Sequence, residues 1–132
     1  MFKLLKIENA RENVPSPVFL DVAANEAVAM GEALVLSSGT LTKCGATTAP
    51  AFIAMADLTA AAAKRTIPVA RVASNQIYEV PVSAAPTSLK VGDKVTLHTD
   101  GLQVTATKDG GVVTVENLNG ATAAGDKIIV RI

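Results

Sequence analysis

The sequence predicts a mainly β protein, built as a small antiparallel β-sandwich or barrel with short helical turns and an extended N-terminal arm. Three observations support this fold class. Valine, isoleucine and threonine occur 16, 7 and 13 times among 132 residues, and these β-branched residues favour strands. Short runs alternate apolar with polar residues. Turn signals that contain glycine separate these runs, which is typical of sandwiches and barrels.

The N-terminal segment, residues 1–16, reads as an arm ahead of a β-rich domain over residues 17–132. Pro15 and Pro17 bias the chain towards extended geometry and stop helices. Charged residues are spaced along the segment at Lys3, Lys6, Glu8, Arg11 and Glu12. We expect an arm that is mobile in the free protein and docks on a partner by adding a strand to the edge of the partner's sheet. The alternative is that residues 2–7 form an edge strand of the protein's own sheet.

The first half of the domain contains short strands separated by turns. Strands are expected over residues 18–22, 32–36, 40–43 and 51–56. The sequence Ser37-Ser38-Gly39 lies between the second and third of these runs, and it predicts a β-hairpin with a left-handed residue in its loop. Residues 23–29 fit either a helical turn or a loop. Alanine occupies four of the seven positions 58–64, which predicts one or two helical turns.

The second half has the more regular pattern. Strands are expected over residues 66–72, 76–82, 94–99, 102–106, 112–116 and 127–132. Asp100-Gly101 is a strong hairpin signal, and Asn119-Gly120 marks a further turn. These strands, joined by tight turns, favour antiparallel packing.

One short pattern, a glycine followed by an acid just before a strand, occurs three times. It appears at Gly31-Glu32, Gly92-Asp93 and Gly125-Asp126. Glycine allows a positive φ, and the acid can accept hydrogen bonds from backbone amides in the same turn. The unequal spacing indicates a reused turn rather than a solenoid repeat.

Residues that could support catalysis or metal binding are few. His98 is the one histidine and Cys44 the one cysteine, so multi-histidine and thiolate metal sites are excluded, as is an internal disulfide. Neither a phosphate-binding glycine loop nor a nucleophile elbow is present. The net charge of 0 and the aromatic content of 3% argue against a nucleic-acid groove. We therefore expect no enzyme activity, no cofactor, no metal and no nucleic-acid or membrane partner.

The order of the strand segments resembles that of small capsid decoration proteins of tailed bacteriophages, also called cement or head-stabilising proteins. The resemblance is carried by residues 31–43, 51–56, 67–72 and 77–82, and it covers about residues 17–132. It implies a structural protein of the virion that is made in the host cytoplasm and binds the outer surface of an icosahedral capsid. It also implies the major capsid protein as partner, a homotrimer on the shell, and stabilisation by bridging capsid subunits.

Other hypotheses about the function stay open. A phage tail or baseplate β-barrel protein would share this composition. A lipoyl-like carrier domain, suggested by the Gly-Asp-Lys turns, or a small barrel enzyme belongs to a different class. The family has no motif residues that transfer one by one, so we place the capsid contact on the arm, whose apolar and basic residues cannot bury themselves alone. The candidate capsid-binding residues are Phe2, Lys3, Leu4, Leu5, Lys6 and Ile7.

Overall fold

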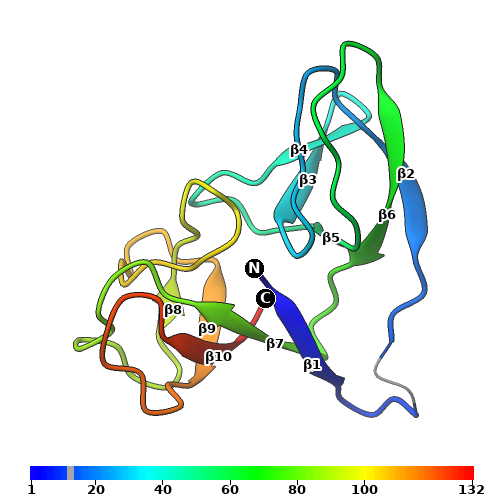
Figure 1. Ribbon diagram of the computed structural model, residues 1–132. Coiled ribbons are helices and arrows are strands. Elements are labelled where there is room, and N and C mark those ends of the chain that lie inside the picture. Colours follow the sequence, from blue (N-terminus) through cyan, green and yellow to red (C-terminus); the bar gives the residue numbers. More distant parts are fainter. Residues whose placement is uncertain (12–13) are drawn as a thin grey trace.

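The computed structural model describes residues 1–11 and 14–132, and within them it contains ten strands and no helix. Five strands form a sheet in the order β1-β7-β10-β9-β8, and the other five close a barrel in the order β2-β4-β3-β5-β6 (Figure 1). The predicted mainly β fold is thereby confirmed. The strands are β1 (Lys3–Ile7), β2 (Val18–Val22), β3 (Ala33–Ser37), β4 (Thr40–Lys43), β5 (Phe52–Ala54), β6 (Arg65–Arg71), β7 (Gln76–Pro81), β8 (Lys94–Val95), β9 (Val113–Asn117) and β10 (Lys127–Arg131).

The first strand belongs to the sheet and is not a free arm. β1 pairs antiparallel with β7, and Phe2 is only 3% exposed. The Phe2 N–H donates to the Gly31 carbonyl at 2.8 Å, and its ring meets Tyr78 edge to face. Residues 2–7 therefore take the alternative form, an edge strand of the protein's own sheet, because Phe2 finds an apolar site within the same chain. Glu12, a charged residue of the expected arm, lies outside the described residues.

The barrel contains a tight hairpin between β3 and β4. Ser37 pairs with Thr40, so the loop consists of Ser38 and Gly39, whose φ angles are 50° and 80°. Two successive positive φ angles are those of a type I′ turn, whose twist matches that of the flanking strands. The predicted left-handed loop residue is confirmed.

Residues 58–64 do not form the predicted helical turns. Leu58 makes a two-way backbone bridge with Val28, and the Ala61 carbonyl accepts from the Asn25 N–H at 2.7 Å. These long-range partners satisfy backbone groups that a helix would satisfy internally, so tertiary pairing overrides the helix propensity of alanine. Residues 23–29 form a loop, which was one of the two expected forms.

The three glycine–acid pairs make three copies of one turn. The turns span residues 29–32, 90–93 and 123–126, and their glycines have φ angles of 78°, 91° and 88°. In each turn the carboxylate of the fourth residue accepts from the backbone N–H of the first, at 2.9, 2.8 and 2.8 Å. The hydrogen bond predicted from the sequence is confirmed in all three.

Each of these turns also fastens the strand that follows it to a neighbouring segment. The glycine N–H donates to one residue of that segment at 2.8 Å, and the N–H of the same residue donates back to the carbonyl of the acid at 2.8–3.0 Å. The receiving residues are Ala54, Val115 and Val82. The turns thereby set β3 against β5, β8 against β9, and β10 against β7.

The sheet and the barrel share buried contacts. Ala33 and Ile53 of the barrel lie in the same apolar cluster as Tyr78, Val80 and the other buried side chains of the sheet. The Ala33 N–H also donates to the Gly101 carbonyl at 2.8 Å. The barrel has a second cluster inside it, formed by Val22, Val28, Leu34, Leu41, Phe52, Ala54, Ile67 and Val69.

Alanine substitutions of the turn glycines should separate backbone strain from steric clash. A Cβ at Gly125 would meet nothing within 4 Å, so we expect Gly125→Ala to cost about 1 kcal/mol through its positive φ alone. A Cβ at Gly31 would lie 2.8 Å from the Phe2 carbonyl oxygen, so Gly31→Ala should cost clearly more. Urea denaturation midpoints measure both losses. Equal losses would contradict the contact between β1 and the first turn.

Candidate functional site

The six residues predicted to bind a partner lie on or next to β1, but only half of them are exposed. Lys3, Leu5 and Lys6 are exposed, whereas Leu4 and Ile7 are half-buried. Phe2 is buried against Tyr78. A partner that approached the free protein would therefore touch two basic side chains and one leucine of this set.

β1 is an edge strand of its sheet, and its irregular pairing makes this edge a poor site for a further strand. The pairing of β1 with β7 shifts between Leu4 and Lys6, so Leu5 sits in a β-bulge. Bulges and lysines on edge strands disfavour the addition of another strand. The structure thus supports contact through side chains better than the strand addition expected of a free arm.

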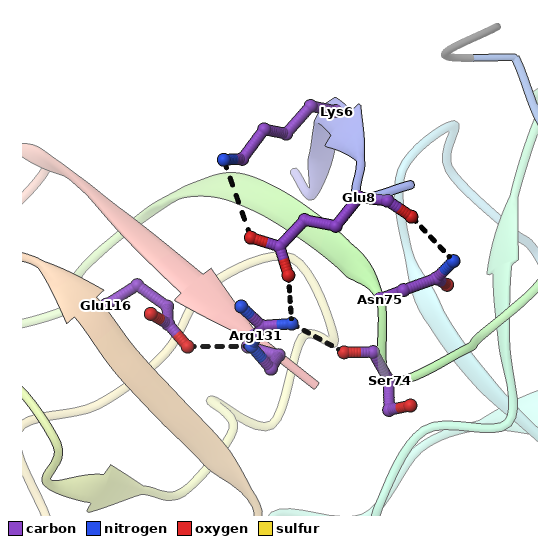
Figure 2. Close-up of polar contacts among 6 residues, drawn as sticks. All are labelled: Lys6, Glu8, Ser74, Asn75, Glu116 and Arg131. Atoms are coloured by element: carbon purple, nitrogen blue, oxygen red, sulfur yellow. Dashed lines mark hydrogen bonds and ion pairs between the residues drawn. The ribbon is translucent and has the colours of Figure 1, made fainter. Parts of the chain in front are cut away.

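A polar network holds the end of β1 (Figure 2). Arg131 of β10 donates from Nη1 to Glu8 Oε2 at 2.9 Å and to the Ser74 carbonyl at 2.7 Å, and from Nε to Glu116 Oε1 at 2.7 Å. The Glu8 N–H donates to the Asn75 carbonyl at 2.7 Å, and Asn75 Nδ2 donates to the Glu8 carbonyl at 3.1 Å. The first strand is therefore tied to the last strand and to the turn before β7.

The charged groups in this network shift one another's pKa values. The hydrogen bond from Arg131 lowers the pKa of Glu8, and the nearby Lys6, whose Nζ lies 3.5 Å from Glu8 Oε1, lowers it further. The hydrogen bonds to Glu8 and Glu116 raise the pKa of Arg131. Sequence reasoning missed this cluster because Glu8 and Arg131 are 123 positions apart and neither belongs to a motif.

On one side of β1 lies an apolar groove with a cavity volume of about 280 Å³. It sits between the sheet and the barrel, and its walls come from residues on both. All three methionines of the chain line it, and Lys3 is its one charged side chain among the described residues. The lining residues are Met1, Phe2, Lys3, Leu4, Val14, Pro15, Met30, Gly31, Ile53, Ala54, Met55, Ala70 and Tyr78.

A second hollow, of about 310 Å³, is lined by two further residues of the predicted site. Leu5 and Lys6 border it together with Ile77 and Ile129, and the carboxylates of Glu8 and Glu116 lie at its polar part with Arg131. Phe2, Lys3 and Leu4 line the first groove and Leu5 and Lys6 line the second, so one strand separates two concave surfaces.

The remaining reactive side chains are occupied with structural contacts. Cys44 is buried, its thiol donates to the Thr48 carbonyl, and burial raises the pKa of this thiol to about 11. His98 Nδ1 lies 3.1 Å from Asp100 Oδ2, and both residues belong to a turn. Across residues 1–11 and 14–132, no group of three histidine, cysteine or acidic side chains could hold a metal ion. In the same ranges no helix could cross a membrane.

The described site is thus a pair of concave surfaces beside an edge strand, a geometry suited to contact with another macromolecule. No known protein family matches the chain, and no curated protein matches it either. Its fold is similar to a solved structure of the N base of the head fiber gp8.5 in bacteriophage phi29, with a TM-score of 0.59. The two share 20% sequence identity, and the match covers 89% of this chain and 94% of the other. At this identity the likeness establishes the fold.

The lowered pKa of Glu8 predicts a pH dependence of stability. A carboxyl whose folded pKa lies below its unfolded value stabilises the fold above the unfolded pKa, and this contribution is lost as pH falls through the folded pKa. We expect Glu8→Gln to be less stable than the native chain at pH 7. The difference should shrink as the pH falls below about 4.5, the ordinary pKa of this carboxyl.

Thermal unfolding from pH 7 to pH 2 measures this difference. Asp109→Asn, on an exposed turn outside the network, is the matched control and should follow the native chain throughout. A deficit in Glu8→Gln that stays constant over the whole pH range would show that the ion pair with Arg131 does not contribute.

Proposed function

We propose that this chain is a structural protein of a phage head that binds the outer surface of the capsid and bridges neighbouring capsid subunits. The observation that carries the proposal is the fold likeness to the phi29 head fiber base, which spans nearly all of both chains. The major capsid protein is the proposed partner, and the chain acts as a homotrimer on the shell.

The proposed capsid contact uses the exposed side chains of β1. Lys3 and Lys6 offer two positive charges, and Leu5 between them offers apolar area. This arrangement suits a partner surface with acidic and apolar groups. The network around Arg131 supports the proposal, because it fixes the end of β1 before a partner arrives, so less conformational entropy is lost on binding.

The proposed role follows from mass action. A protein that binds the assembled shell, but not its separated subunits, stabilises the shell by roughly 2.7 kcal/mol per site at a free concentration of 100 times Kd. Three linked copies add avidity, since each further contact is intramolecular once the first has formed. Bridging can therefore strengthen a shell without strong individual contacts.

Substitutions on β1 test the contact surface. We expect Lys6→Glu combined with Leu5→Ser to weaken binding to purified expanded capsids at least tenfold, because it reverses a charge and removes the exposed leucine, both outside the apolar groove. The capsids should come from the phage or prophage that encodes this chain and should lack the protein. Co-sedimentation over a concentration series gives the affinity, and circular dichroism confirms that the variant is folded.

Lys64→Glu is the control, because Lys64 is an exposed basic residue on the barrel and lies outside β1. It should bind as the native chain does. Unchanged affinity of the β1 variant would refute the contact surface alone. Failure of the native chain to bind capsids, or binding to tails instead, would refute the proposed function.

Shell stability is the second test. DNA-filled particles that carry the protein should retain their DNA to higher temperature than particles stripped of it, because each bound copy must be released before the shell opens. Release of DNA can be followed by the fluorescence of an intercalating dye during heating. The same release temperature for both kinds of particle would contradict a stabilising role, even if the protein binds.

A further inference from the structure

The outer face of the barrel carries an apolar row next to the groove beside β1. Phe19 of β2 pairs with Pro68 of β6, and the Pro68 carbonyl accepts from the Met55 N–H at 3.0 Å. Residues opposite one another on neighbouring strands point to the same face, so these three side chains form a row across the sheet. Phe19 is 66% exposed and therefore lies on the outer face.

This row runs into the groove. Met55 lines the groove, and the row ends there after two strand spacings, about 10 Å from Phe19. Three further exposed apolar side chains border the groove, namely Met1 at 48%, Met30 at 47% and Val14 at 72%. A protruding aromatic ring and a concave apolar site thus lie close together on one side of the molecule.

The size of this surface matches what an interface between two copies needs. Phe19, Val14, Met1 and Met30 together expose on the order of 400 Å². A standard interface buries roughly 800 Å² on each partner, of which about 56–65% is apolar. The net charge of 0 means that two copies do not repel each other through their overall charge.

We propose that a second copy of this chain docks on this surface, with Phe19 of one copy inserted into the methionine-lined groove of the next. A cavity of about 280 Å³ is too small for a typical drug-sized ligand, but it suits an aromatic side chain. Methionine side chains are flexible and adapt to an inserted ring, and their sulfur makes favourable contacts with aromatic groups.

The ring and the groove are different parts of the surface, so the proposed contact can repeat head to tail from one copy to the next. Repeated around a threefold axis, a head-to-tail contact closes a ring of three copies in which each Phe19 and each groove is used. This inference rests on the homotrimer of the proposed function, for which it names the surface, and it does not depend on capsid binding.

Cross-linking between two singly substituted chains tests the contact. One chain carries Pro17→Cys, two residues before Phe19, and the other carries Met30→Cys. Both positions are exposed, so folding is not at risk, and the Phe19 ring is kept in both chains. We expect a short bis-maleimide to join the two chains when they are mixed, and to join far fewer within either chain alone. The native Cys44 does not interfere, because it is buried.

Val91→Cys mixed with Met30→Cys is the matched control. Val91 is 65% exposed, but its turn leads into β8, at the edge of the sheet opposite β1. Light scattering complements the cross-linking: the native chain and Val91→Ser should have the mass of three chains, and Phe19→Ser the mass of one.

Three results would overturn the inference: a native chain that stays monomeric at millimolar concentration, a Phe19→Ser variant that remains trimeric, or equal cross-linking in the control pair. The capsid experiment separates this failure from failure of the proposed function. Capsid binding by the native chain, together with no cross-link between Pro17→Cys and Met30→Cys, refutes the docking surface alone. One that cross-links as expected but does not bind capsids refutes the proposed function alone.

Discussion

The glycine–acid turn is the constraint on which the arrangement of this fold depends. A positive φ at the glycine aims its N–H at the neighbouring segment, and the acid holds the turn closed through the backbone N–H three residues earlier. Two backbone bonds then fix one residue of that segment opposite the turn. Since a slip of one residue would move every side chain to the other face, these turns decide which residues enter the core.

The first of the three turns has an additional task, which sets it apart from the others. Its acid, Glu32, is buried, and burial raises the pKa of its carboxyl; Lys43 Nζ lies 3.6 Å from Oε1. The carbonyl of its glycine, Gly31, accepts a hydrogen bond from the Phe2 N–H. The backbone of Phe2 lies so close that a side chain at position 31 would clash with it. This turn therefore joins the barrel to β1. The unfavourable desolvation free energy of the buried Glu32 carboxylate falls at this junction.

Features that depend on neighbouring residues could be read from the sequence, and those that depend on distant pairing could not. The β3–β4 hairpin and the hydrogen bonds of the three turns were predicted because glycine and short acidic side chains determine them locally. The pairing of β1 with β7 joins segments about seventy positions apart, as in Lys3 with Glu79. The groove needs residues from β1, β5, β6 and β7, so no local pattern could indicate it.

The position of β1 links the two proposed contacts physically. Its residues 2–4 line the apolar groove, whereas residues 5 and 6 line the second hollow, and the bulge at Leu5 separates the two sets. Because Arg131 anchors one end of this strand and Gly31 the other, β1 cannot shift towards one surface without breaking a bond at an end. Docking of a second copy in the groove would therefore stiffen the strand whose exposed side chains form the proposed capsid contact, and this ordering would lower the entropic cost of that contact.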